Sequence, residues 1–171
     1  SMDKIFLIGF MGCGKSTFGR KLAHKIGWEF IDLDDYIEKE EQRDIKTIFE
    51  LEGENYFREL ETNTLNSLKN HKSTVISCGG GTPCFNENIH VINELGLSVY
   101  IKLSPETLMK RLISEKSKRP LIASKKNSEL LEFIEQKLNE RQSFYHQAHV
   151  TFDYSSKDEG KFIDFITEKV G

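Results

Sequence analysis

A glycine-rich stretch near the N-terminus has the residue types and spacing needed to bind phosphate. Residues 9–16 read Gly-Phe-Met-Gly-Cys-Gly-Lys-Ser, which matches the G-x-x-x-x-G-K-[ST] pattern of a phosphate-binding loop. Gly12 and Gly14 let the backbone turn tightly, so that successive N–H groups point toward phosphate oxygens. We expect Lys15 to reach the β- and γ-phosphates of a nucleotide, and the Ser16 hydroxyl to bind Mg²⁺.

The segments on either side of this loop are those that the motif requires. Residues 4–8 read as a short buried strand, and the residues that follow the loop, as far as about Ile26, read as a helix. The N-terminus of that helix adds its positive dipole end to the phosphate site. The alternative is a glycine-rich turn that carries a lysine and a serine by chance, and this context disfavours it.

Two carboxylates follow the second predicted strand. Asp32 and Asp34 come directly after the strand predicted at residues 29–31. The carboxyl ends of parallel strands form the ligand crevice of such a sheet. Asp32 is therefore expected near the loop, where it can hold Mg²⁺ directly or through water. Asp34 can accept a hydrogen bond from a substrate hydroxyl or take its proton. Alternatively, Asp34 or Asp35 caps a helix from residue 36 onward.

Three consecutive glycines, Gly79–Gly81, follow the strand predicted at residues 74–77. Such a run costs folding entropy, and it is useful where the backbone must approach a ligand closely. Since the run follows a strand directly, we expect it to lie in the crevice beside the phosphate-binding loop. The alternative is a flexible loop.

Three arginines are candidates for binding anions. Arg58 lies one turn from both Glu54 and Glu61, and in isolation a helical salt bridge is its simplest interpretation. Arg119 lies in the polar stretch 114–128, which is typical of a functional lid, and Arg141 lies late in a helix. An arginine over the γ-phosphate would stabilise charge in phosphoryl transfer, and one facing the crevice could grip a carboxylate. A surface arginine is the usual alternative.

The predicted elements alternate between strands and helices. Strands are predicted at 4–8, 29–31, 74–77, 98–102 and 150–152, and helices at 17–26, 36–41, 45–52, 55–69, 87–94, 105–114, 128–145 and 157–169. Asp44 is expected to cap the helix that begins at residue 45, and Gly53 to interrupt it. This alternation predicts an α/β fold in three layers, with a parallel sheet covered by helices on both faces.

Composition limits the classes of partner. The 171 residues suit one domain, and 37% hydrophobic and 30% charged residues are typical of a globular protein. A net charge of −3 gives no reason to expect nucleic acid or an anionic membrane as partner, and no apolar run approaches the length of a membrane span. The three cysteines lack metal-ligand spacing, and there is no basic and apolar leader, so we expect a cytoplasmic protein. Monomer is the default expectation.

Taken together, these motifs resemble the shikimate kinase family, part of the nucleoside-monophosphate-kinase-like P-loop group. The P-loop alone is shared by many families, but the set in this order is far more specific. The resemblance covers nearly the whole chain and rests on residues 9–16, Asp32-Leu33-Asp34, Phe57-Arg58, Gly79–Gly81, Arg119-Pro120-Leu121 and Glu140-Arg141 with Tyr145.

The resemblance implies a fold, a domain organisation and a reaction. The fold would be a three-layer P-loop kinase fold with a five-stranded parallel sheet of order 2-3-1-4-5, in one domain over residues 1–171. A substrate-binding segment would span residues 33–61 and a mobile lid residues 111–124. The enzyme would transfer the γ-phosphate of ATP to the 3-hydroxyl of shikimate, which gives shikimate 3-phosphate and ADP in chorismate and aromatic amino-acid biosynthesis.

The resemblance also assigns roles to residues. The catalytic residues would be Lys15, Asp34 and Arg119. The ATP-binding residues would be Gly12, Cys13, Gly14, Lys15, Ser16, Thr17 and Arg119. The shikimate-binding residues would be Asp34, Arg58, Gly80, Gly81 and Arg141, and Ser16 and Asp32 would hold Mg²⁺.

The chain departs from the family pattern at two places. Many members have a small residue and Val after the triple glycine, where this chain has Thr82-Pro83-Cys84. The arginine that some members use near adenine has no clear counterpart in residues 151–157.

Three alternatives remain open at this point: another small-molecule kinase such as a gluconate or nucleotide kinase, a GTPase-type switch, and a nucleotide-binding regulatory module. The switch lacks support because the sequence contains no Asn-Lys-x-Asp and no Asp-x-x-Gly.

Overall fold

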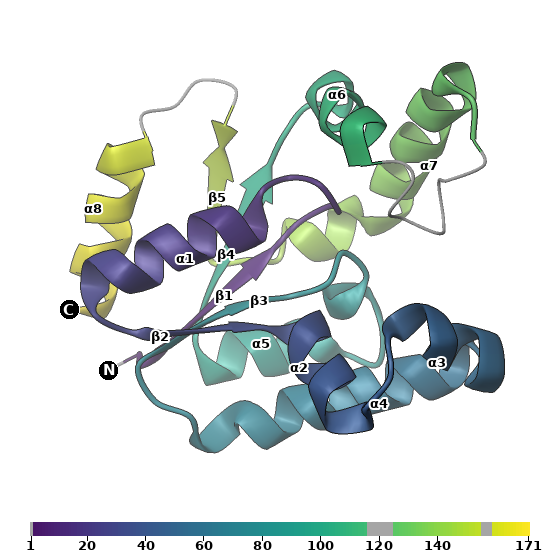
Figure 1. Cartoon of the computed structure of the whole chain (residues 1–171). Coiled ribbons are helices and arrows are strands. Elements are labelled where there is room, and N and C mark those ends of the chain that lie inside the picture. The colour runs from purple at the N-terminus through teal and green to yellow at the C-terminus, as the bar shows by residue number, and fades with distance from the viewer. Residues whose placement is uncertain (1, 116–124, 155–158) are drawn as a thin grey trace.

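The computed structural model describes residues 2–115, 125–154 and 159–171. At its centre is a parallel sheet of spatial order β2-β3-β1-β4-β5 (Figure 1), which confirms the expected fold class and strand order. The five strands are β1 (Lys4–Ile8), β2 (Glu29–Asp32), β3 (Thr74–Ser77), β4 (Leu97–Lys102) and β5 (Val150–Asp153).

Helices connect the strands and lie within a few residues of the predicted positions. They are α1 (Lys15–Ile26), α2 (Leu33–Glu41), α3 (Ile45–Glu52), α4 (Glu54–Ser67), α5 (Asn88–Leu95), α6 (Pro105–Glu115), α7 (Asn127–Tyr145) and α8 (Glu159–Val170). Two short 3₁₀ helices, η1 (Leu68–Asn70) and η2 (Thr82–Cys84), were not expected from the sequence. Within the described ranges, none of the helices combines the length and apolar character needed to cross a bilayer.

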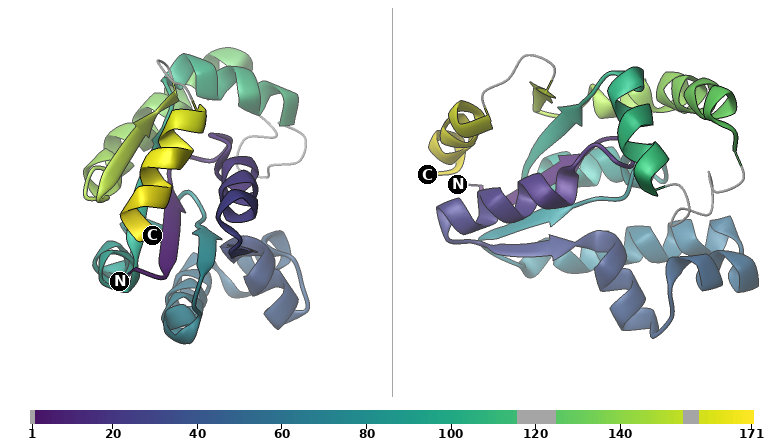
Figure 2. Two further views of the ribbon diagram at one scale, coloured as in Figure 1. Left: turned by 90° about the vertical axis from the view of Figure 1, so that its left-hand side faces the viewer. Right: turned by 45° about the horizontal axis from the view of Figure 1, so that its top comes forward.

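The side chains of β1 alternate between two hydrophobic cores, one on each face of the sheet. Ile5 and Leu7 pack in a core with residues of α1, α6, α7 and α8, whereas Phe6 and Ile8 pack in a core with residues of α2, α3, α4 and α5. Because both faces of β1 are covered, its sequence is a continuous apolar run. The views in Figure 2 show the resulting three layers, with the sheet between the two sets of helices.

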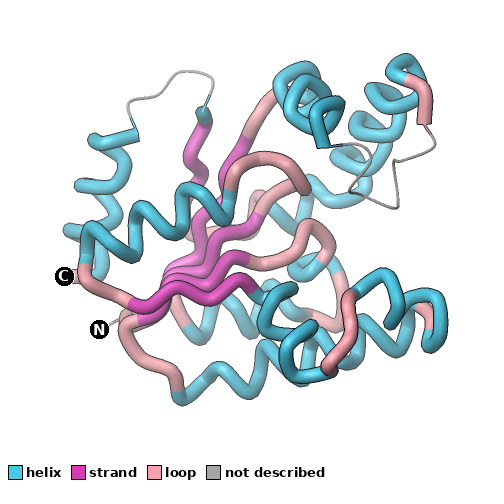
Figure 3. Tube along the Cα trace, viewed as in Figure 1, coloured by secondary structure: helices cyan, strands magenta, loops and turns pink. Residues whose placement is uncertain are grey.

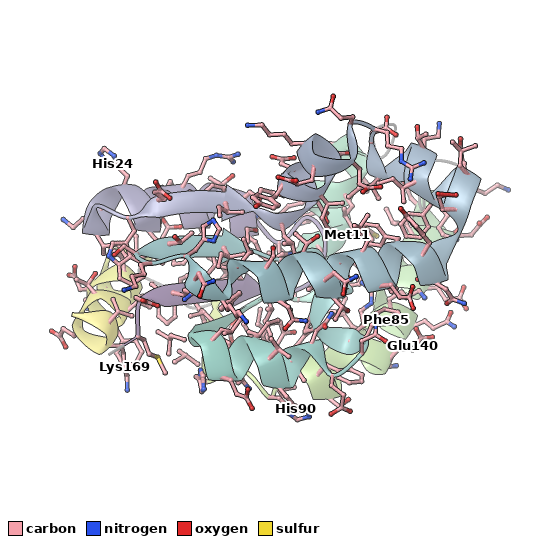
Figure 4. The ribbon with its side chains drawn as sticks, turned by 90° about the horizontal axis from the view of Figure 1, so that it is seen from below. Met11, His24, Phe85, His90, Glu140 and Lys169 are labelled. Atoms are coloured by element: carbon pink, nitrogen blue, oxygen red, sulfur yellow. The ribbon has the colours of Figure 1, made fainter. Side chains whose placement is uncertain are left out.

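The loops that follow β1 and β3 leave the sheet at the same end (Figure 3). Met11, in the loop after β1, and Phe85, shortly after the triple glycine, both lie toward this end, whereas His24 and Lys169 lie at the opposite end (Figure 4). The predicted phosphate-binding loop and the triple glycine therefore face the same crevice at the carboxyl edge of the sheet.

Local signals set the helix boundaries around this crevice. Asp44 caps α3 by accepting a hydrogen bond from the Thr47 N–H (2.8 Å), as expected. Gly53 separates α3 from α4 with φ +88°, which confirms the predicted break. The alternative in which Asp34 or Asp35 caps this helix is wrong, because α2 begins at Leu33 and Asp32 is its cap, accepting the Asp35 N–H (3.1 Å). Asp34 thus lies in the first turn of α2.

Close contact between α1 and the sheet depends on Gly19. A Cβ atom at this position would lie 2.5 Å from Phe30 Cε1 and 2.9 Å from Leu7 Cδ1. Because α1 carries the end of the phosphate-binding loop, this close approach also determines where the loop lies over the sheet.

We predict that Gly19→Ala destabilises the protein by about 1–3 kcal/mol, because the added methyl overpacks the contact with Phe30 and Leu7. The cost of overpacking exceeds the gain in helix propensity, which is about 1 kcal/mol, so the net change is a loss of stability. Urea denaturation measures the difference, with Lys25→Ala on the exposed face of α1 as a control expected to stay within about 0.5 kcal/mol of wild type. A Gly19→Ala variant as stable as wild type would show that α1 can move away from the sheet at no cost.

Candidate active site

A cavity of about 470 Å³ opens at the carboxyl edge of the sheet. It is bordered by the loop after β1, the start of α2, the end of β3 and the end of α6. Its lining residues are Met11, Gly12, Gly14, Lys15, Ser16, Thr17, Asp32, Asp34, Ser77, Cys78, Gly79, Gly80, Arg111 and Ser114. This volume and polar lining are suited to a small charged ligand.

The N-terminus of α1 forms one wall of the cavity. Gly14 precedes the helix with φ +92°, and no side chain in the part of the chain that the structure describes caps it. The first turn, from Lys15 to Thr17, borders the cavity. Uncapped N–H groups and the positive end of the helix dipole make this wall a phosphate-binding surface.

The ammonium group of Lys15 is folded onto the loop that carries it. Its Nζ donates to the carbonyl oxygens of Gly9 (2.7 Å) and Phe10 (3.0 Å), and it lies 3.7 Å from Cys13 Sγ. Phosphate oxygens would therefore have to compete with loop carbonyls for this lysine. Cys13 is buried and lies behind the loop rather than on the cavity wall, and its N–H donates to the Phe10 carbonyl (3.3 Å).

Side-chain oxygen atoms of Asp32, Ser16 and Ser77 lie close together at the N-terminus of α1. The Ser16 hydroxyl donates to Asp32 Oδ2 (2.6 Å), and its Oγ lies 3.4 Å from Ser77 Oγ. Carboxylate and hydroxyl oxygens are the ligands that Mg²⁺ prefers, and few of them are needed when phosphates complete its coordination. This set of donors fits the expected magnesium site.

Asp34 lies between the phosphate-binding loop and the triple glycine. Its side chain is half-buried, and a Cβ atom at Gly79 would lie 3.1 Å from Asp34 Oδ1. Burial is the largest cause that raises the pKa of Asp34 from 3.8 to about 7, and the neighbouring charges of Asp32 and Glu61 add to it. Lys15 opposes the shift. A carboxyl with this pKa can accept or release a proton near neutral pH.

The triple glycine is where the predicted substrate-binding residues meet. A Cβ atom at Gly80 would lie 3.2 Å from Arg141 Nη1, and one at Gly81 would lie 2.7 Å from Arg58 Nη2. With Asp34 beside Gly79, a different charged side chain lies against each glycine. Asp34 and Arg141 are more than 100 residues apart in the sequence, with Arg58 between them, and the fold brings all three to one short segment of backbone.

Arg58 forms both salt bridges that its position on α4 suggested. Its Nη1 donates to Glu61 Oε1 (3.0 Å), and its Nη2 and Nε donate to Glu54 Oε2 (3.3 and 3.4 Å). The two glutamates differ in burial, because the Glu61 side chain is 1% exposed and the Glu54 side chain 55% exposed. The Arg58 guanidinium also lies over the Phe85 ring, 4.1 Å from its centroid. The salt bridges therefore do not place Arg58 on the surface; they hold it at the site.

Arg141 has an unused hydrogen-bond donor. Its Nη1 is buried and has no hydrogen-bond partner among the residues that the structure describes. Next to it, the Tyr145 hydroxyl donates to the Gly80 carbonyl (2.5 Å), and burial raises the pKa of Tyr145, so this hydroxyl stays protonated. Buried donors are rarely left without a partner, and a guanidinium in this position is suited to a carboxylate.

The structure brings most, but not all, of the predicted residues to the cavity wall. Those on the wall are Gly12, Gly14, Lys15, Ser16, Thr17, Asp32, Asp34 and Gly80. Arg58, Gly81 and Arg141 border the triple glycine just beyond it. Arg119 and most of the predicted lid, 111–124, lie outside the described residues.

Arg111 is a cavity residue that the sequence did not single out, beyond its place at the start of the predicted lid. A Cβ atom at Gly14 would lie 2.7 Å from Arg111 Nη1, and the Arg111 guanidinium lies 5.8 Å from the centroid of the Tyr154 ring. No motif marks it, because its relevance comes from α6 folding back over the phosphate-binding loop.

Comparison with known proteins places this site in a family. The model of the shikimate kinase family matches residues 11–170. A shikimate kinase of Parabacteroides distasonis is 43% identical over 152 residues, which are 89% of this chain and 88% of that protein. The chain belongs to the shikimate kinase family.

Solved structures of shikimate kinases share the fold over nearly the full chain. The enzyme from Bacteroides thetaiotaomicron has a TM-score of 0.89 at 38% identity, and covers 99% of this chain and 97% of its own. A shikimate kinase from Acinetobacter baumannii, described as a complex with shikimate, has a TM-score of 0.85 at 33% identity, with 99% and 93% covered. The resemblance inferred from the sequence is thus confirmed at the level of family and fold.

The raised pKa of Asp34 predicts a pH-dependent cost in stability. Between pH 4 and pH 7 the folded protein keeps a proton on Asp34 that the unfolded chain has released, so this group opposes folding more strongly as the pH rises, and fully above pH 7. We therefore expect Asp34→Asn to be more stable than wild type at pH 8 by a few kcal/mol, with a difference that disappears toward pH 4.

Denaturant titrations at several pH values measure this difference. The matched control is Asp164→Asn on the exposed face of α8, which should change stability little at any pH. A difference between Asp34→Asn and wild type that stays constant from pH 4 to pH 8 would contradict the prediction.

Proposed function

We propose that this member of the shikimate kinase family transfers the γ-phosphate of ATP to the 3-hydroxyl of shikimate, with shikimate 3-phosphate and ADP as products. The observation that carries this proposal is the convergence of Asp34, Arg58 and Arg141 on Gly79–Gly81, directly beside a phosphate-binding loop. A donor site for phosphate would thus adjoin an acceptor site for a hydroxylated acid, with Asp34, Gly79 and Gly80 common to the cavity and to the triple glycine. The Acinetobacter baumannii relative, described with shikimate bound, supports the same acceptor here.

The acceptor half of the site consists of two arginines, a carboxylate and glycine backbone. Arg141, with its unpartnered Nη1, and Arg58 would bind the substrate carboxylate, because guanidinium groups donate paired hydrogen bonds to carboxylates. Gly80 and Gly81 lie between them and would present backbone to the same ligand. Asp34, which lies toward the phosphate-binding loop, would bind a ring hydroxyl of the substrate.

The donor half consists of the phosphate-binding loop and the start of α1. Gly12 to Thr17 would surround the phosphates of ATP, Lys15 would exchange its loop carbonyls for phosphate oxygens, and Arg119 would approach the γ-phosphate from the lid. Ser16 and Asp32 would hold Mg²⁺. When bound, the metal neutralises charge that develops between the β- and γ-phosphates.

The proposed reaction is an in-line attack of the substrate hydroxyl on the γ-phosphorus. Asp34 orients the hydroxyl and accepts its proton, and its pKa of about 7 allows a deprotonated population at neutral pH. Lys15 and Arg119 offset negative charge on the transferring group. Exclusion of water matters because water is a competing acceptor, and we propose that residues 111–124 act as the lid that excludes it.

We further propose that residues 1–171 work as one domain and as a monomer in the cytoplasm, with residues 9–16 as the P-loop and residues 33–61 as the substrate-binding segment. In support, α2, α3 and α4 carry Asp34 and Arg58 to the triple glycine as one continuous segment of chain. Small molecules, rather than nucleic acid or membranes, are the partners that a net charge of −3 and a polar cavity favour.

An ADP-release assay with a panel of acceptors tests the reaction. We expect turnover with shikimate and none above background with gluconate or nucleoside monophosphates. Asp34→Asn should lose turnover by at least about 100-fold, because proton transfer by a positioned group contributes that much, while ATP binding is largely retained. Near-normal phosphorylation of shikimate by Asp34→Asn would rule out the role proposed for this carboxylate.

Arg111 should contribute to the binding of ATP and not to the binding of shikimate. Its guanidinium lies beside Gly14 and Tyr154, whereas those of Arg58 and Arg141 lie against Gly81 and Gly80. We predict that Arg111→Ala raises the KM for ATP about tenfold, consistent with the loss of one charge-assisted contact, and changes the KM for shikimate less than twofold. Steady-state kinetics with each substrate varied in turn provide the measurement; an effect confined to the shikimate KM would move Arg111 out of the nucleotide site.

A further inference from the structure

Thr82 directly follows the triple glycine. The residue is fully buried at the start of η2 and is followed by Pro83. Its hydroxyl donates to Glu61 Oε2 at 2.6 Å, and both partners are buried. A small residue without a hydroxyl could fill the same space but could not make this bond.

Glu61 uses its two carboxylate oxygens for two different partners. Oε2 accepts from the Thr82 hydroxyl, and Oε1 accepts from Arg58 Nη1 (3.0 Å). A carboxylate with one bond can turn about its terminal torsion, whereas two bonds on opposite oxygens fix its plane. Thr82 therefore determines the orientation in which Glu61 meets Arg58.

The backbone of Thr82 is held independently of its side chain. Its N–H donates to the Gly79 carbonyl (3.1 Å), and its carbonyl accepts from Asn88 Nδ2 (2.9 Å). Asn88 is itself buried, and its Oδ1 accepts from the Thr62 hydroxyl of α4 (3.0 Å). Because these bonds keep the loop in place, removal of the hydroxyl alone should leave the position of Thr82 unchanged.

We propose that Thr82 is a positioning residue for substrate binding: through Glu61, it holds the Arg58 guanidinium against Gly81 in the orientation that receives the substrate carboxylate. The inference rests on the proposed function, in which Arg58 binds that carboxylate. Through Glu61, the hydroxyl links the loop of the triple glycine to Arg58 on α4. The glycine backbone and the guanidinium, which together form the carboxylate site, thus keep a fixed orientation toward each other.

Loss of the hydroxyl should change the partners of Arg58. Glu61 Oε2 would remain buried without a donor, which disfavours the present orientation of the carboxylate. Arg58 would then depend more on Glu54, whose side chain is 55% exposed and pulls the guanidinium toward solvent. Substrate affinity would fall, while the phosphate-binding loop and Asp34 would be unaffected.

Thr82→Val removes the hydroxyl and keeps the shape of the side chain. We expect the KM for shikimate to rise about tenfold, with kcat and the KM for ATP each within about twofold of wild type. Thr82→Ser restores the donor and should restore the KM to within about twofold of wild type. Thr64→Val on the same helix is the control, because that buried hydroxyl donates only to the Leu60 carbonyl in the described contacts and should leave both KM values unchanged.

A double variant tests whether Thr82 acts through Glu61. In a Glu61→Gln background, Thr82→Val should add less than twofold to the KM for shikimate, since the two residues act on Arg58 in series. Independent, multiplicative effects would overturn the proposal. Thr82→Ala, which places no methyl groups against Glu61, serves as a second hydroxyl deletion should Thr82→Val fold poorly, and the same rise in KM is expected.

The outcomes separate this inference from the proposed function. Normal turnover of shikimate by wild type with an unchanged KM in Thr82→Val would overturn only the inference. A rise in KM that Thr82→Ser fails to reverse, or one that extends to ATP together with a lower Tm, would also overturn it, since the effect would then be structural. Absence of shikimate turnover by wild type would overturn both.

Discussion

The site depends on the close approach of three charged side chains to one short segment of backbone, whose glycines have no side chains of their own. Gly79, Gly80 and Gly81 lie against Asp34, Arg141 and Arg58, and any Cβ atom there would come within 2.7 to 3.2 Å of a charged side-chain atom. The three side chains come from α2, α7 and α4, which the parallel sheet holds at its carboxyl edge. Helix packing on both faces of the sheet is therefore what sets the distances in the cavity.

Burial at the carboxyl edge of the sheet raises the pKa of Asp34. The charges of Asp32 and Glu61 disfavour ionisation of Asp34, and Lys15 opposes them, while Arg58 pairs with Glu61. Burial is the largest cause, and together with the neighbouring carboxylates it raises this pKa to about 7. A group that is costly to ionise in the folded state is typical of a site where the proton is used in chemistry. Stability is thus reduced at the carboxyl to which the proposed function gives the proton transfer.

Much of the fold and of the donor half could be predicted from the sequence, because the signals are local. The phosphate-binding loop lies between a strand and a helix, Asp44 caps α3, and Gly53 ends it. The cap of α2 could not be assigned from the sequence because Asp32, Asp34 and Asp35 offer the same chemistry within four residues, and only the backbone selects among them. The links of Thr82 to Glu61 and of Arg111 to Gly14 join distant segments, so neither leaves a mark in local spacing.

Arg58 shows why a salt bridge on a helix does not argue against a role in binding. Glu54 is largely exposed, and such a pair contributes about 0.3–0.5 kcal/mol, little enough for a substrate carboxylate to displace it. Glu61 is buried and is held by a second donor, so its separation from Arg58 would leave a buried charge without its partner, which is far more costly. An incoming carboxylate in the proposed reaction would therefore exchange with Glu54 and leave Glu61 in place. The sequence shows two equivalent glutamates one turn from the arginine; their difference in burial separates the exchangeable partner from the one that fixes its orientation.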